Sequence, residues 1–177
     1  MLGVLSGTIT TENFPQNYPS DSKCFYRIRV PQSFKIKIIF DEFDVEYDKK
    51  CRNDFMAITD KENQPWNCSF CQRLCGEKSE DIVIIKSDGT KEIMEKTNEL
   101  VIDSNSIYVH LISDEEDEFQ GFQIKYEAIY DPSVLNSSPQ FSESTGLTQL
   151  NDKKLASCQH YCSKNPSQCP YDGKKHT

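Results

Sequence analysis

The stretch Phe40–Asp54, FDEFDVEYDKKCRND, concentrates acidic side chains around one cysteine, Cys51. Crowded carboxylates repel one another unless a positive charge lies among them. The stretch therefore indicates a bound cation. Glu46 and Asp54 are the first candidate ligands because they flank Cys51, where a disulfide would hold both ends of the turn. A third candidate, Asp114, lies far downstream in ISDEEDEF.

The composition is typical of a protein made in an oxidising, secretory compartment. Eight cysteines and two Asn-x-Ser sequons, at Asn67 and Asn136, occur in 177 residues, as expected for a secreted glycoprotein. The formal net charge of −8 disfavours nucleic acid and anionic membranes and favours basic partners or cations. No run approaches the ~20 apolar residues of a membrane span. The opening MLGVLSGTIT lacks the features of a signal peptide, so we expect a trimmed chain or an internal piece of a larger secreted protein.

Alternation of apolar and polar residues with period two predicts strands in the first part of the chain. The pattern is clearest over residues 24–30, 35–40, 54–59, 106–112 and 121–126. Many short strands separated by turn residues predict an all-β fold, an antiparallel sandwich.

Five blocks resemble, in order and spacing, the successive motifs of a CUB domain over about 125 residues. They are GTITTENFPQNYPSDSKCFYRIRVP (7–31), IIFDEFDVEYDKKCRNDFMAITD (38–60), RLCG (73–76), DSNSIYVHLISD (103–114) and GFQIKYEA (121–128). The resemblance implies the jelly-roll β-sandwich of that family, which agrees with the strand pattern and specifies its topology.

The resemblance also implies a calcium site. Calcium-binding members use a Glu before the second cysteine, an Asp shortly after it and an Asp in a later Ser-Asp block, and the matching residues here are Glu46, Asp54 and Asp114. Calcium takes six to eight oxygen ligands. Tyr18 matches the family tyrosine that supports the first carboxylate.

The remaining acids of the ISDEEDEF loop have two interpretations. A run of charge is usually a solvated surface, and we expect this loop mainly to be one. Glu116 and Asp117 are nevertheless expected to support the metal, with a backbone carbonyl of the loop completing its shell.

The cysteine pattern departs from the family. The resemblance implies a bridge between Cys24 and Cys51 and matches Cys75 to the third family cysteine, whereas the fourth is absent. Two groups of three cysteines then remain, and full pairing of odd groups requires at least one bridge between tail and core. These groups are Cys68, Cys71 and Cys75 in the core and Cys158, Cys162 and Cys169 in the tail. Zinc held by these cysteines and His160 is the alternative, which an oxidising compartment disfavours.

Residues 1–130 are expected to form the CUB-like domain, which contains one inserted segment and is followed by two further segments. Residues 77–98 are longer than the corresponding family loop and predict an inserted hairpin, with a strand over 82–86 and a turn over 87–89. We expect it to be a structural elaboration rather than a binding loop. Residues 131–150 are rich in Ser, Pro, Thr and Gln and predict a linker. Residues 151–177 predict a disulfide-stabilised, mostly irregular tail, either a truncated small module or an extension stapled to the sandwich.

The sequence carries no recognised catalytic motif, and His110 is expected on the polar face of its strand. Together with the resemblance, this predicts a secreted, non-catalytic module that binds an extracellular protein in a calcium-dependent way, through a Lys or Arg of the partner. Two alternatives are an accessory domain of a larger secreted protease and a stand-alone effector of venom or parasite type. Sequence upstream of Met1 would separate them.

Overall fold

A computed structural model describes residues 6–61 and 71–133 and the backbone of residues 156–160. These residues form 11 strands. They are β1 (Ser6–Thr10), β2 (Ser22–Arg29), β3 (Phe34–Val45), β4 (Phe55–Thr59), β5 (Gln72–Glu77), β6 (Ile82–Lys86), β7 (Lys91–Ile93), β8 (Glu99–Ile102), β9 (Ser106–Ile112), β10 (Gly121–Tyr130) and β11 (Ala156–His160).

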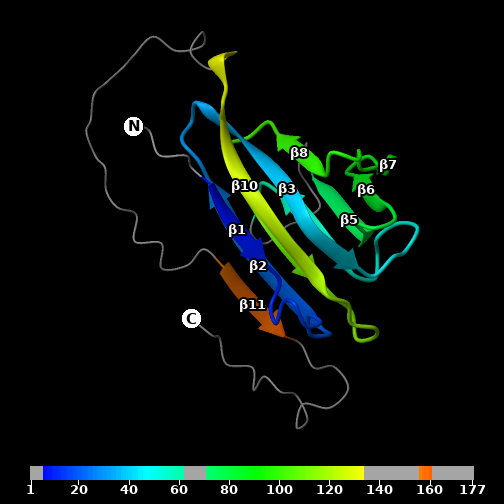
Figure 1. Cartoon of the computed structure of the whole chain (residues 1–177). Coiled ribbons are helices and arrows are strands. Elements are labelled where there is room, and N and C mark those ends of the chain that lie inside the picture. Colours follow the sequence, from blue (N-terminus) through cyan, green and yellow to red (C-terminus); the bar gives the residue numbers. More distant parts are fainter. Residues whose placement is uncertain (1–5, 62–70, 134–155, 161–177) are drawn as a thin grey trace.

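The strands build an antiparallel β-sandwich, as predicted. Their order is β1-β10-β3-β5-β4-β9-β2-β11, with β6 and β7 continuing outward from β5 and β8 pairing with β3. The long β3 pairs with β10 along most of its length but with β5 only through Asp44 and Val45, so its end joins the two halves of the fold. Figure 1 shows β11 on the opposite side of the molecule from the β6 and β7 hairpin.

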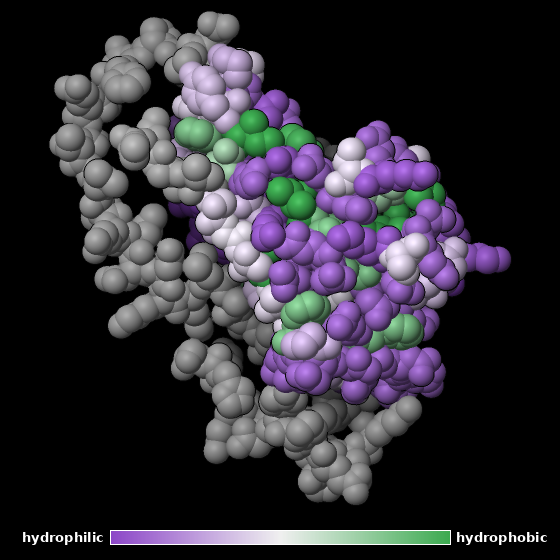
Figure 2. Space-filling model, in the orientation of Figure 1, coloured by the Kyte–Doolittle hydropathy of each residue, from purple (hydrophilic) through white to green (hydrophobic). Residues whose placement is uncertain are grey.

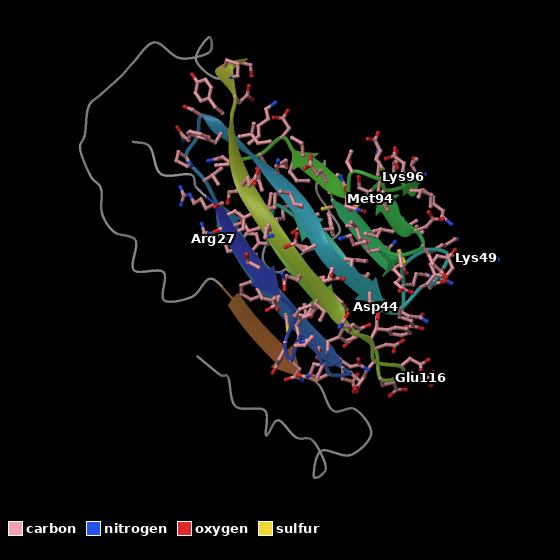
Figure 3. The ribbon with its side chains drawn as sticks, in the orientation of Figure 1. Arg27, Asp44, Lys49, Met94, Lys96 and Glu116 are labelled. Carbon is pink, nitrogen blue, oxygen red and sulfur yellow. A yellow bond between two sulfur atoms is a disulfide. The ribbon has the colours of Figure 1, made fainter. Side chains whose placement is uncertain are left out.

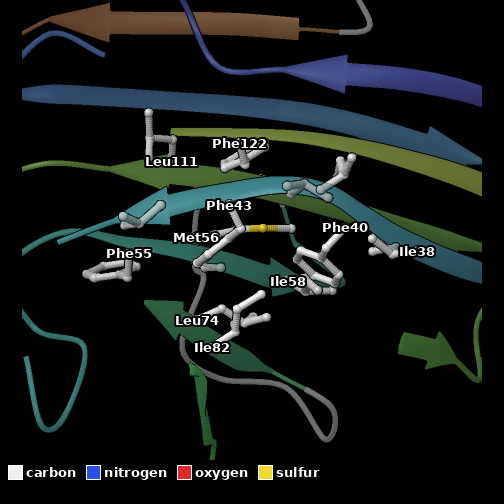
Figure 4. Close-up of a cluster of buried hydrophobic side chains, with 14 of the residues drawn as sticks. Ile38, Phe40, Phe43, Phe55, Met56, Ile58, Leu74, Ile82, Leu111 and Phe122 are labelled. Atoms are coloured by element: carbon white, nitrogen blue, oxygen red, sulfur yellow. The ribbon is translucent and has the colours of Figure 1, made fainter. Parts of the chain in front are cut away.

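The core follows from alternation along β3. Ile36, Ile38 and Phe40 are buried. Lys35 and Lys37, which alternate with them, are partly exposed and form ion pairs with Asp131, just after β10, and with Glu127 on β10. The rings of Phe43 and Phe122 stack with centroids 6.3 Å apart in the centre of the core (Figure 4). Each such side chain contributes about 1.5–3 kcal/mol by leaving water. The outer surface in Figure 2 is mostly hydrophilic, with smaller apolar areas between.

The inserted segment forms a hairpin that belongs to the core. β6 covers the residues expected for its first strand, and it pairs with β5 on one side and β7 on the other. Its residues Ile82–Ile85 are all buried. Gly89 has a φ of 85° in the turn, a conformation that glycine adopts without steric cost. The insertion therefore extends the sheet.

The predicted bridge between Cys24 and Cys51 is wrong. Cys51 is bonded to Cys75, with the two Cα atoms 5.5 Å apart. Cys75 lies on β5, which β4 and β9 separate from the β2 strand that carries Cys24. Three steps of about 4.8 Å between neighbouring strands amount to about 14 Å, whereas a disulfide needs Cα atoms within about 7 Å.

The other cysteines with described side chains are oxidised as well. Cys24 and Cys71 each form a disulfide, with partners whose side chains lie outside the described residues. Because Cys71 and Cys75 are both in disulfides, their sulfurs are not zinc ligands. The tail, expected to be mostly irregular, contributes strand β11, which pairs with β2.

Candidate metal centre

Three predicted ligands come together at one end of the sandwich. Glu46 directly follows β3, Asp54 directly precedes β4, and Asp114 lies two residues after β9. The paired strands β4 and β9 place Phe55 opposite Ile112, which brings the two aspartates to the same end. One oxygen from each of the three carboxylates lies within 4.8 Å of the others. Figure 3 labels Asp44 and Glu116, which lie near this end of the molecule.

Asp54 is the inner member of the cluster and is completely buried. Its Oδ2 accepts a hydrogen bond from the Tyr18 hydroxyl at 2.6 Å, and its Oδ1 accepts one from the Asp114 amide at 2.7 Å. Burial, followed by the bond to Asp54, raises the pKa of Tyr18, so the hydroxyl remains a neutral donor. These two bonds fix the orientation of the carboxylate before any ion binds.

The role of Tyr18 differs in detail from the prediction. The hydroxyl was expected to support Glu46, but it donates to Asp54 and only accepts a long 3.4 Å bond from the Glu46 backbone amide. The sequence indicated that Tyr18 lies beside the carboxylates. Which carboxylate accepts its hydrogen bond depends on the side-chain geometry of the folded protein, which local sequence patterns do not predict.

Glu46 has a buried carboxylate oxygen that a cation would fit. Its Oε1 accepts a bond from the Asn53 side-chain amide at 3.0 Å, but its Oε2 is buried without a hydrogen-bond partner. Leaving a buried charged acceptor unpaired costs about 1–3 kcal/mol or more. A hard cation, which prefers carboxylate oxygens, fits this position. Asn53 was not predicted, and its place directly before Asp54 was the only available signal.

The electrostatics of the cluster point the same way. The pKa of Asp54 is raised to about 7: burial is the largest cause, the hydrogen bonds from Tyr18 and the Asp114 amide lower it, and the charges of Asp114 and Glu46 raise it. Three carboxylates without a cation therefore hold more negative charge than the site can stabilise at neutral pH. A divalent ion would remove this penalty.

The supporting role predicted for Glu116 and Asp117 stays a prediction. The Glu116 amide donates to Asp114 Oδ1 at 2.9 Å, but the side chains of Glu116 and Asp117 are exposed and do not belong to the described carboxylate group. The backbone amide of Glu116 thus orients the carboxylate of Asp114, a candidate ligand. The sequons at Asn67 and Asn136 lie outside the described residues, as do Cys68, Cys162, Cys169 and the side chain of Cys158.

Besides the carboxylate cluster, an acidic concavity lies between the end of β3 and the inserted hairpin. Its volume is about 280 Å³, and its lining includes four acids together with Tyr47 and Ile93. The Lys91 ammonium lies 5.8 Å from the centre of the Tyr47 ring, a favourable cation–π distance. Tyr47 follows Glu46 in the chain, so the acidic surface continues from the carboxylate cluster toward the hairpin.

Fold and site together define an all-β interaction module, and comparison with known proteins identifies its family. Residues 3–126 match the CUB domain model. The chain belongs to the CUB domain family, whose members serve extracellular proteins as non-catalytic protein-interaction modules. Among the described residues, no helix is long and apolar enough to cross a membrane.

Several relatives are longer proteins. Human CUB and zona pellucida-like domain-containing protein 1 is 29% identical over 137 residues, 77% of this chain and 19% of the relative. Human Tolloid-like protein 1 is 29% identical over 154 residues, 82% of this chain and 13% of the relative. The CUB1-EGF-CUB2 structure of human MASP-1/3 aligns with a TM-score of 0.56 at 22% identity, covering 90% of this chain and 58% of that one. The chain thus spans less than a fifth of the length of these two relatives.

Proposed function

We propose that Glu46, Asp54 and Asp114 bind Ca²⁺ and that the loops ordered by the ion bind an extracellular protein through a Lys or Arg side chain. The observation that carries this proposal is the convergence of three carboxylate oxygens within 4.8 Å, one carboxylate having a buried, unpaired oxygen. Because calcium accepts six to eight oxygens, water and backbone oxygens would complete its coordination.

The three carboxylates differ in their exposure and therefore in their proposed roles toward the metal and the partner. Asp54 is fully buried and already oriented, so it serves as the inner ligand. Glu46 and Asp114 are only partly buried, which leaves carboxylate surface for an incoming ammonium or guanidinium group. Charge-assisted hydrogen bonds of this kind are about twice as strong as neutral ones.

The surroundings favour a basic partner. The described part of the chain includes the acidic concavity beside Tyr47, and residues 1–130 carry a formal charge of −9, against +1 for the rest. Complementary charge accelerates and orients association more than it adds affinity. Added salt should therefore slow the association, and a chelator should abolish it.

The proposed setting is extracellular. Disulfide-bonded Cys24, Cys51, Cys71 and Cys75 fit an oxidising compartment, and glycans at Asn67 and Asn136 would belong to the same secretory route.

The test compares two identical substitutions on or beside one strand. Glu46→Gln removes a charged ligand, whereas Glu42→Gln removes an exposed charge from the same strand and serves as the control. Calorimetry should show calcium binding to wild type and to Glu42→Gln, with at least a tenfold loss for Glu46→Gln. Capture on a surface of immobilised lysine, with an acetylated surface as reference, should follow calcium binding. Equal calcium affinity of both variants refutes the metal site, and calcium-independent capture refutes its role in recognition.

A further inference from the structure

The edge of the sandwich contains a cysteine pair that the family resemblance does not account for. β11 pairs antiparallel with β2, and the register places Cys158 directly opposite Cys24. Cys24 is fully buried and forms a disulfide. Figure 1 shows β11 lying along β2 at this edge. The identity of the Cys24 partner therefore decides how the C-terminal segment is attached.

Two of the three other cysteines with described side chains are excluded because they bond to each other, as Cys51 and Cys75 do. The third, Cys71, directly precedes β5. Between β5 and β2 lie β4 and β9, a separation of about 14 Å at the usual strand spacing. The partner of Cys24 is consequently Cys68 or a cysteine of the C-terminal segment.

The register distinguishes among the remaining candidates. Residues directly opposite on antiparallel strands have Cα atoms about 4.5–5.5 Å apart and share one face of the sheet. Disulfides need Cα atoms about 4.4–6.8 Å apart. We propose that Cys24 and Cys158 form a disulfide that fixes β11 to the edge of β2.

The chemistry of this cross-link balances with one co-reactant. Two thiols lose two protons and two electrons as the sulfur–sulfur bond forms, and a dithiol–disulfide oxidant of the secretory compartment accepts them as its own disulfide is reduced to two thiols. Cys51 is then free to pair with Cys75, as the structure shows. The cross-link also supplies the connection between core and tail that an odd number of cysteines in each requires.

The cross-link holds β11 against β2, which would otherwise be an edge strand at this side of the described sheet. In the described sheet, β2 pairs with β9 on one side and with β11 on the other, over residues 22–26. An edge strand with unpaired amides and carbonyls is a template for pairing with another chain. The C-terminal segment therefore protects the sandwich from strand addition, independently of the calcium site.

Peptide mapping tests the proposal on the unmodified protein. Non-reducing digestion of the full chain should yield one peptide pair containing Cys24 and Cys158, and the pair should disappear on reduction. Mapping of Cys24 to Cys68, Cys162 or Cys169 overturns the proposal. This measurement requires no variant to fold.

A matched pair of variants tests the consequence for the edge. Cys158→Ser should expose one thiol at Cys24 and speed hydrogen exchange of the amides of residues 22–26 at least tenfold. Cys162→Ser, a change four residues further along the tail, should leave the exchange of these amides as in wild type. If Cys158→Ser leaves Cys24 oxidised, or if both variants open residues 22–26 equally, the assignment is wrong.

Discussion

Asp54 and His110 are both fully buried ionisable side chains, but their pKa values shift in opposite directions. Burial raises the pKa of Asp54 to about 7 and lowers that of His110 to about 4, so each resists becoming charged. Around Asp54 lie two more carboxylates. The Nε2 of His110 lies near two neutral oxygens, 3.4 Å from Thr59 Oγ1 and 3.2 Å from the Lys61 carbonyl, and the charge of Lys23 lowers the pKa of the imidazole further.

A buried ionisable side chain indicates a binding site only when neighbours clustered around it add charge of the same sign. His110 remains neutral beside the rings of Phe25 and Tyr108, although its buried Nδ1 has no hydrogen-bond partner among the described residues. Asp54, with a pKa of about 7, is partly ionised at neutral pH, and its negative charge is then opposed by the charges of Glu46 and Asp114. A buried group whose neighbours share its charge requires a counter-ion. We therefore assign a structural role to His110 and keep Asp54 in the proposed metal site.

The largest expected effect comes from neutralising Asp54. Its pKa of about 7, against an ordinary value of 3.8, corresponds to as much as about 4 kcal/mol lost on ionisation. In chelator at pH 8, Asp54→Asn should therefore be more stable toward urea than wild type. Calcium should narrow this difference, because a ligand at 100 times its Kd stabilises only the protein that binds it, by about 2.7 kcal/mol.

The control is Asp60→Asn, the same substitution at an exposed position just after β4. It should leave both the stability in chelator and the calcium response unchanged. If Asp54→Asn is strongly destabilised in chelator and still responds to calcium, Asp54 is a structural acceptor for Tyr18 and not a ligand.

Local patterns in the sequence predicted much of the fold. The alternation in Ser106–Ile112 gave the bounds of β9, and the apolar run Ile82–Lys86 gave those of β6. Glu46, Asp54 and Asp114 were predicted together because they flank the ends of β3, β4 and β9, strands that the alternation had located. In contrast, the five residues of β11, ASCQH, contain only two small apolar residues, Ala156 and Cys158, an alternation too short to predict a strand without the pairing with β2.

The failures share one physical cause, which is contact between residues distant in sequence. The partner of Cys51 depends on which strand lies next to the loop after β3, and the family pattern suggested Cys24 where the strand order selects Cys75. His110 does alternate with Val109 and Leu111, as expected, but the face on which it lies is covered and not solvated. The expected polar-face position was therefore wrong in its exposure.

A smaller effect isolates His110. Its folded pKa of about 4 lies below the ordinary 6.5, so the unfolded chain binds the extra proton and stability falls as pH falls from about 6.5 to about 4. The difference corresponds to about 3 kcal/mol. Urea unfolding of chelated Asp54→Asn should show this slope, and the double variant with His110→Gln should not. A slope that survives His110→Gln would assign it to another group.

The smallest expected effect is a near cancellation in wild type without calcium. Because the folded pKa of Asp54 is raised, its contribution to stability is complete below 3.8 and is lost as pH rises toward 7. Over pH 4.5–6.5 this loss opposes the gain from His110, and the two have similar slopes. Asp41, Asp48, Asp88 and Asp131 have lowered pKa values, so their contributions change below this window.

The unfolding free energy of chelated wild type should therefore vary by less than about 1 kcal/mol across this window, whereas that of Asp54→Asn should rise by about 2–3 kcal/mol. Saturating calcium should restore the steeper rise in wild type, because the ion holds Asp54 ionised and leaves His110 as the titrating group. Urea unfolding at half-unit pH intervals, with and without calcium, measures all three profiles. If chelated wild type rises as steeply as Asp54→Asn, Asp54 is ionised without a metal and the contrast between the two buried groups fails.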